Sequence, residues 1–174
     1  HVNQLTTLDV SQNTALYNLY CGYNQLASLD VSNNPVLQTL SCSGNQLTTL
    51  DVSNNNSLHN LYCSDNQLIS LDISLSPGVG RLRCMNNQLT SLDLRNGNTS
   101  WDTSATWVNF TNNPQLYCID VDDATYSTTN WTVANGIINS WNNFSNNCQN
   151  EIYGCTDPNT PNYNPLATIN DMTC

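Results

Sequence analysis

The hydrophobic pattern of the chain repeats at a fixed spacing. Leu, Val and Cys recur in the order L-x-x-L-x-[V/C]-x-x-N, and an Asn-Gln-Leu triplet opens each longer unit at residues 3, 24, 45, 66 and 87. Successive triplets are 21 residues apart, and the unit that starts at residue 87 is 26 residues long, with a five-residue insertion. A fixed period of roughly 20–29 residues is typical of solenoids, in which each unit buries its apolar side chains only against its neighbours.

Each unit contains two similar halves. The segments "LTTLDVSNN" and "LHNLYCSDN" follow the same pattern, and no stretch of about ten residues has the spacing of a helix. We therefore predict a mainly β solenoid, with a short parallel strand around each "LxC" segment and a second extended segment around each "LDVS" segment. Little or no helix is expected on the convex side.

The pattern resembles the bacterial leucine-rich repeats with nested periodicity, the IRREKO type. The stretch "WVNFTNNPQLYCIDVDDATYSTTNWTVANGIINSWNNFSNNC" keeps the spacing at first and then becomes rich in aromatic residues. It is similar to the C-terminal caps of such repeats in secreted proteins of the Bacteroidetes. The last segment, "YGCTDPNTPNYNPLATINDMTC", resembles a short Cys-bounded module of exported flavobacterial proteins.

These resemblances imply three parts. Residues 1–117 are expected to form the leucine-rich-repeat solenoid, residues 118–150 a disulfide-bonded C-terminal cap, and residues 151–174 a Cys-bounded tail module. No equivalent cap precedes Leu5, so we expect that natural N-terminal sequence precedes His1.

Four of the eight cysteines lie one repeat apart and share the inward parity of the neighbouring leucine. They are Cys21, Cys42, Cys63 and Cys84. A straight column with ~4.8 Å between neighbours cannot converge on a tetrahedral zinc ion, which disfavours metal binding. Disulfides within the column are a second alternative. We expect buried free thiols that replace leucine or valine.

The other four cysteines bracket the two C-terminal segments. Cys118 and Cys148 flank the cap, and Cys155 and Cys174 flank the tail. We predict these two disulfides, each of which closes a loop whose cross-linking stabilises by about 3–4 kcal/mol in the chain-entropy account. Disulfides favour an exported protein, either secreted or at the cell surface.

The charge balance excludes several functions. The chain has three arginines, no lysine and 13 acidic residues, for a net charge of −10. Such a protein cannot neutralise a row of phosphates, so nucleic-acid binding is excluded and docking on anionic membranes is disfavoured. No apolar run is long enough for membrane insertion. With two histidines and neither a nucleophile elbow nor a phosphate-binding glycine loop, we predict that the chain is not an enzyme.

Two polar rows follow the repeat. An asparagine ends each "LxCxxN" segment and is expected to bond the backbone of its turn and of the next coil. An aspartate follows the second leucine of each unit and is expected to bond the nearby hydroxyls of Thr7, Ser28, Thr49, Ser70 and Ser91, or to bind cations loosely. The two rows are Asn24, Asn45, Asn66 and Asn87, and Asp9, Asp30, Asp51, Asp72 and Asp93.

No cofactor is expected, apart from a candidate calcium site in the tail. Asp157, Asn159 and Asp171 offer the oxygen ligands that Ca²⁺ prefers, although their spacing fits no EF-hand loop. Ordinary Asx turns are the alternative interpretation.

The outward positions of the "LxxLxC" strands gather aromatic and arginine side chains, which are the usual anchors of interfaces. The alternative is that exposed tyrosines merely favour strand formation. We predict a monomeric protein that binds a protein or glycan partner on this face, or alternatively a structural spacer of a larger surface protein, stabilised by cations. The predicted contact residues are Tyr20, Tyr62, Asn60, Arg81, Arg83, Trp107 and Asn109.

Overall fold

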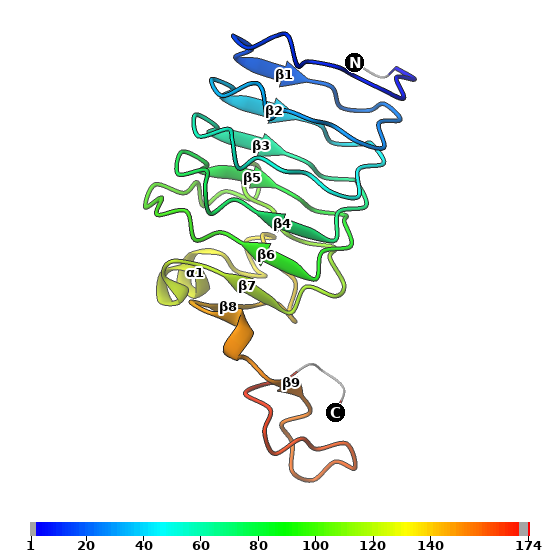
Figure 1. Cartoon of the computed structure of the whole chain (residues 1–174). Helices are drawn as coiled ribbons and strands as arrows, with labels where there is room; N and C mark the ends of the chain where they lie inside the picture. The colour runs from blue at the N-terminus through cyan, green and yellow to red at the C-terminus, as the bar shows by residue number, and fades with distance from the viewer. Residues whose placement is uncertain (1–2, 171–173) are drawn as a thin grey trace.

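The computed structural model describes residues 3–170 and 174, which form a stack of flattened coils followed by a small tail (Figure 1). One wall of the stack is a four-stranded parallel sheet in the order β1-β2-β3-β5, called here the first sheet. Its register places Leu19, Leu40, Leu61 and Leu82 opposite one another, one repeat apart. The predicted strand at each "LxC" segment is therefore confirmed. Its strands are Asn18–Tyr20 (β1), Thr39–Ser41 (β2), Asn60–Tyr62 (β3) and Arg81–Arg83 (β5).

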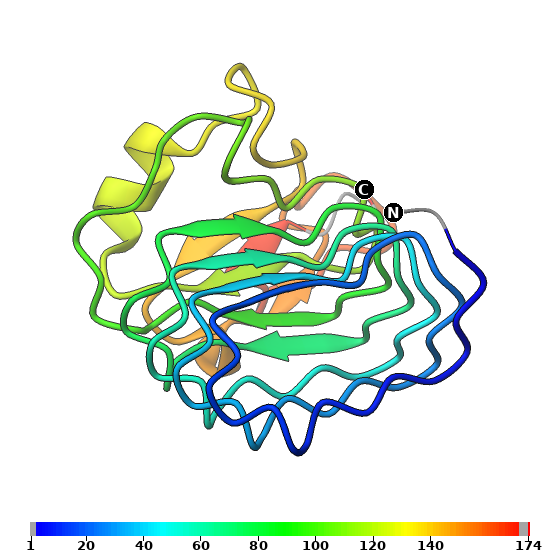
Figure 2. The same ribbon diagram turned by 90° about the horizontal axis from the view of Figure 1, so that it is seen from above.

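A second parallel sheet, in the order β4-β6-β7-β8, forms the opposite wall of the coils (Figure 2). The "LDVS" segments enter it as strands from the fourth unit onward. Ile119 of β7 pairs with Phe144 of β8, so the sheet runs on from the repeats into the cap. Its strands are Ser70–Asp72 (β4), Ser91–Asp93 (β6), Cys118–Asp120 (β7) and Asn143–Ser145 (β8).

The core between the two sheets is a stack of leucines beside the cysteine column. Leu40, Leu61 and Leu82 are fully buried, as are Cys42 and Cys63. The column cysteines are free thiols in this structure. Burial raises the pKa of Cys21 to about 11 and that of Cys42 and Cys63 well above the ordinary value of 9.0. These thiols are therefore protonated at neutral pH and are poor nucleophiles.

The ladder asparagines join each coil to the one before it. Asn45 accepts a hydrogen bond from the Leu26 amide (3.0 Å) and donates to the carbonyls of Cys42 (2.8 Å) and Cys21 (3.2 Å). The next coil repeats this pattern, since Asn66 accepts from the Leu47 amide. Each buried amide thus satisfies one donor and two acceptors of the backbone, which fixes the distance between coils.

The residue before each ladder asparagine has a left-handed backbone, which allows the turn to close. Gly44 has a φ of 70°, and Asp65 and Asn86 have φ values of 55° and 56°. Gly, Asn and Asp tolerate this conformation best, whereas Tyr23, with a φ of 55°, is the unusual member of the row.

A second asparagine row crosses the coils elsewhere and was not singled out from the sequence. Asn55 is fully buried and donates to the carbonyls of Val31 and Asn34, both at 2.9 Å. Ser76 takes this place in the fourth unit and donates to the Val52 carbonyl. In the fifth unit, Asn96 donates to the carbonyls of Ser76 and Val79.

The cap packs aromatic side chains where the repeats pack leucine. Helix α1, Ala124–Asn130, begins after Asp123, whose carboxylate accepts from the Tyr126 amide (2.9 Å). Trp131 follows the helix and packs on Phe110 and Phe144, with ring centroids 5.6 and 5.7 Å away. This is the one α-helix among the described residues, as the prediction of little or no helix required.

The C-terminal disulfides are confirmed. Cys118 on β7 is bonded to Cys148 at the start of the 3-10 helix η1 (Cys148–Asn150), and Cys155 is bonded to Cys174. The tail adds a small parallel pair, β9 (Tyr153–Gly154) with β10 (Ile169–Asn170), below the solenoid in Figure 1. The division of the chain at residues 117 and 150 stays a prediction.

Candidate binding face and the cavities beside it

The outward face of the first sheet carries the predicted contact residues in two rows. The parallel register aligns Tyr20, Ser41 and Tyr62 with Arg83 in one row, and a β-bridge adds Asn109 beside Arg83. The neighbouring row contains Asn18, Thr39, Asn60 and Arg81.

Exposure differs among these side chains. Tyr20 is 67% exposed and Trp107 is 38% exposed, whereas Tyr62, Arg83 and Asn60 are half-buried. Thr39, which lies in the same row as Asn60 and Arg81, is buried. Its hydroxyl accepts a hydrogen bond from the Asn60 side chain at 3.1 Å.

Four side chains form a compact group called here the Trp107 cluster: Tyr62, Arg81, Asp102 and Trp107. The Arg81 guanidinium carbon lies 4.7 Å from the centre of the Trp107 ring, a cation–π contact. The Tyr62 ring centre is 6.2 Å from that of Trp107. Arg81 also faces Asp102 at 3.5 Å, so one carboxylate neutralises the charge that the tryptophan ring covers.

The other predicted contact residues stand apart from this cluster. Tyr20 lies two strands away, across Ser41. Asn109 is engaged in its own turn, since its oxygen accepts from the Thr111 amide and its nitrogen donates to Gly136. Arg83 is half-buried, and its Nε has no hydrogen-bond partner among the described residues. Asp102, which was not predicted, could have been found only from the insertion that brings it to Arg81.

The environment keeps Tyr62 protonated. Burial raises the pKa of the Tyr62 phenol, while the charges of Arg81 and Arg83 act in the opposite direction. The phenol is therefore a neutral group at physiological pH and can both donate and accept a hydrogen bond.

A polar hollow of about 470 Å³ borders the Trp107 cluster. His59 lies on its rim, and the Nδ1 atom of its ring is 2.7 Å from the Ser57 carbonyl. The hollow combines amide, hydroxyl and charged groups beside an aromatic ring, which suits a polar ligand. Its lining includes His59, Asn60, Arg81, Asn98, Ser100 and Asp102.

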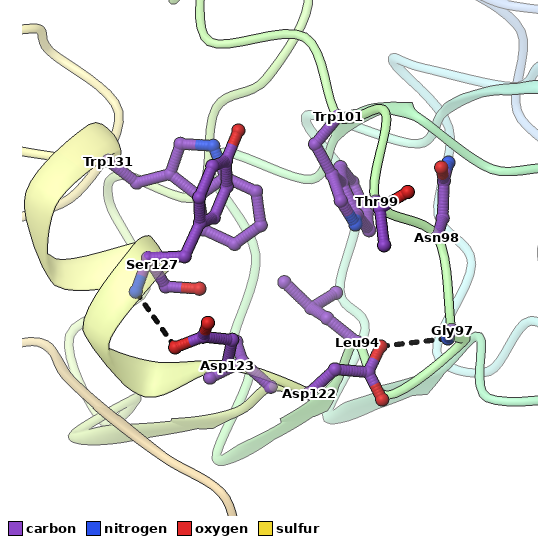
Figure 3. Close-up of a pocket in the computed structure, with 11 residues that line it drawn as sticks. Leu94, Gly97, Asn98, Thr99, Trp101, Asp122, Asp123, Ser127 and Trp131 are labelled. Carbon is purple, nitrogen blue, oxygen red and sulfur yellow. Dashed lines mark hydrogen bonds between the residues drawn. The ribbon is translucent and has the colours of Figure 1, made fainter.

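A second cavity, of about 380 Å³, lies between the insertion of the fifth unit and helix α1 (Figure 3). It is called here the insertion cavity. Sequence analysis missed it, because the insertion and helix α1, which form two of its walls, do not follow the repeat. Its lining includes Leu94, Trp101, Val121, Asp122, Tyr126 and Trp131.

The aspartate row bonds differently from the prediction. Asp51 accepts from the Ser53 amide two residues ahead (2.8 Å), and Asp30 accepts from the Ser32 amide (2.9 Å). The partners are these backbone amides in Asx turns, and not the predicted hydroxyls of Thr7, Ser28, Thr49, Ser70 and Ser91. The hydrogen bonds from Ser53, with its amide first, lower the pKa of Asp51. At the end of the row, Arg95 bonds Asp93 and lies 3.5 Å from Asp120.

The tail aspartate forms a turn of the same kind. Asp157 accepts from the backbone amide of Asn159 (2.9 Å) and from its side chain (3.0 Å). Asp171, the third predicted calcium ligand, lies outside the described residues. Within residues 3–170 and 174, no three His, Cys, Asp or Glu side chains are grouped as metal ligands would be.

Comparisons with known proteins identify a solved structure with a similar fold. No family model and no curated protein matches the sequence. Among solved structures, the chain is similar to the functional domain of InlJ from Listeria monocytogenes, described as including a cysteine ladder, with 33% sequence identity and a TM-score of 0.54. The chain is a leucine-rich-repeat-type solenoid. The match covers 68% of this chain and 29% of the solved InlJ chain, so it spans less than a third of that chain's length.

Two further features of the solenoid belong beside this comparison. The inward column of Cys21, Cys42, Cys63 and Cys84 gives it a ladder of stacked cysteines of its own. Among the residues that the structure describes, no helix has the length and apolarity needed to cross a bilayer.

Proposed function

We propose that the chain is a non-enzymatic binding module of a secreted or cell-surface protein, and that it holds a protein or glycan partner on the outward face of the first sheet. The observation that carries this proposal is the Trp107 cluster, in which Tyr62, Arg81 and Trp107 meet at the surface. Aromatic and arginine side chains supply most of the binding energy in interfaces.

The surroundings of the cluster support the same function. Neighbouring strands fix the backbones of Tyr62 and Arg81. Contacts with Trp107 and Asp102 restrain their side chains, so less side-chain entropy is lost on binding. Arg81 pairs with Asp102, which suits recognition better than proton transfer. The two disulfides support an oxidising compartment outside the cytosol, and the sequence resemblance favours an exported Bacteroidetes protein.

A glycan array and a pull-down from biotinylated surface proteins test the proposal. The wild-type chain is compared with Tyr62→Ala and Trp107→Ala. Tyr163→Ala is the matched control, because Tyr163 is 41% exposed in the tail, away from the sheet. We expect at least a tenfold loss of capture in the two cluster variants and unchanged capture by the control. Trp107→Ala is expected to stay folded, with a loss of unfolding free energy below about 1 kcal/mol.

Two outcomes would contradict the proposal. Equal capture by the wild type and both cluster variants would place the binding site elsewhere. Capture of nothing on either platform would favour the alternative, a structural spacer in which only the length of the solenoid matters.

A further inference from the structure

The insertion cavity exists because the repeat is interrupted. The extra residues of the fifth unit lie within residues 97–106, and they leave the stack to face helix α1 across the cavity (Figure 3). Its volume of about 380 Å³ is large enough for a small organic molecule, since ligand pockets span roughly 300–1,000 Å³.

The walls of the cavity are apolar and aromatic. Leu94 and Val121 contribute aliphatic surface from the repeat side. The Trp101 and Trp131 rings meet at 78° with centroids 5.1 Å apart, and the Tyr126 ring meets Trp131 at 83° and 6.3 Å. These rings give the cavity an apolar, aromatic lining that suits the hydrocarbon body of an organic guest. Trp131 is 98% buried, and its Nε1–H has no partner among the described residues.

The mouth of the cavity is acidic. The Asp122 carboxylate accepts from the Gly97 amide through one oxygen (2.8 Å), and Asp123 caps α1 through one oxygen (2.9 Å). Figure 3 shows both residues at the same side of the cavity, below the tryptophan rings. None of the described lining residues is basic, and the three arginines of the chain lie elsewhere.

We propose that the insertion cavity binds a small organic cation, namely an ammonium group on an aromatic or aliphatic body. The body fills the space between Leu94, Val121 and Trp101, and the ammonium group lies at the mouth beside Asp122 and Asp123. This site shares no contact residue with the Trp107 cluster, so it stands independently of the proposed function. The ammonium group can come from a free amine or from a lysine side chain of a peptide.

Calorimetric titration of the whole chain tests whether binding requires a positive charge. The three ligands share a phenyl ring and a short chain and differ in the charge of their end group. Phenylethylammonium carries the cation, 2-phenylethanol is neutral, and phenylacetate is an anion. We expect saturable binding of the ammonium, at least tenfold weaker binding of the alcohol, and no binding of the anion. Added salt is expected to weaken the ammonium complex, because the mouth is exposed to solvent.

Isosteric variants test the assigned residues. Asp122→Asn and Asp123→Asn keep an acceptor oxygen for Gly97 and for the helix, since asparagine also caps helices well. The double variant is expected to bind phenylethylammonium at least tenfold more weakly, with little change in thermal unfolding. Asp51→Asn makes the same change in a regular coil and is expected to bind like the wild type. Thr99→Arg, which places a cation on the exposed rim, is expected to abolish binding.

A second amine tests whether the bound cation comes from a free amine or from a lysine side chain of a peptide. Nα-acetyl-lysine methylamide represents a peptide side chain, and binding at least as tight as that of phenylethylammonium assigns the site to a peptide lysine, whereas weaker binding assigns it to a free amine. Three outcomes would overturn the proposal. They are equal affinity for the ammonium and the alcohol, retained affinity in the Asn double variant, and no saturable binding of either amine up to about 10 mM.

Discussion

The first four coils and the region from residue 87 to 148 bury their interiors by different means. In the regular coils, leucines and small thiols stack one repeat apart, and buried asparagines such as Asn45 and Asn66 carry hydrogen bonds from coil to coil. In the later region, Trp131 gathers four other aromatic rings around itself, and a disulfide joins β7 to the end of the cap.

This difference explains where binding sites can form. A regular coil presents the same backbone and nearly the same side chains as its neighbour, so any hollow in it is repeated and shallow. The insertion breaks this symmetry once, and it supplies Trp101 to one cavity and Asp102 to the Trp107 cluster. Asn98 lines both the insertion cavity and the polar hollow. Both candidate sites therefore depend on one interruption of the repeat.

The largest expected effect is in the aromatic interior. Trp131→Ala should lower the free energy of unfolding by about 3–5 kcal/mol, because it removes the ring on which the cap packs. Trp107→Ala, at an exposed position in the same region, should cost less than about 1 kcal/mol. Urea denaturation followed by circular dichroism measures both. Equal losses in the two variants would mean that the cap does not depend on its aromatic interior.

The next largest effect compares the cysteines of the cap, which form a disulfide, with those of the repeats, which are buried thiols. Replacing Cys118 and Cys148 together by alanine should cost about 2–4 kcal/mol, since the cross-link restrains the unfolded chain. Cys63→Ala removes a buried thiol and should cost about 1 kcal/mol. Thiol titration of the wild type in denaturant without reductant should find four reactive groups, and few or none in the native state. Zero thiols in denaturant would contradict the free column.

The regular coils should respond most to loss of their asparagines. Asn66→Ala leaves the Leu47 amide and the carbonyls of Cys42 and Cys63 without their partner. Buried backbone groups left unpaired in this way cost about 1–3 kcal/mol. Asn54→Ala, at a neighbouring turn position with no side-chain bond of this kind, serves as the control. If both variants unfold at the same urea concentration, the ladder does not hold the coils together.

The repeated half of the fold could be predicted from the sequence, whereas the interrupted half could not. The parity of "LxC" placed Leu61 and Cys63 inward and aligned Tyr62 with Arg83, because a fixed period repeats one environment many times. Asp102 and Trp101 have no equivalent in other coils, so no pattern indicated their contacts. The aspartate row was predicted only in part. Its position followed from the repeat, but its hydrogen-bond donors are backbone amides and not hydroxyls, because local turn geometry decides which donor is within reach.

The smallest expected effect concerns the aspartate row, whose carboxylates place negative charges at the surface of the regular coils. The lowered pKa of Asp51 means that its contribution to stability is present above its usual pKa of 3.8 and is lost as the pH falls through the lower folded value. Asp51→Asn keeps the acceptor for Ser53 and also removes repulsion from Asp30, so at pH 7 it should change the free energy of unfolding by less than about 0.5 kcal/mol. The wild type and the variant should converge in urea titrations as the pH falls from about 5 through the ordinary pKa of 3.8 and on through the lower folded pKa, because the protonated carboxyl then resembles the asparagine amide. A wild type that gains stability relative to the variant as the pH falls would mean that the carboxyl is better bonded when protonated, and that the row is not held by amide donors.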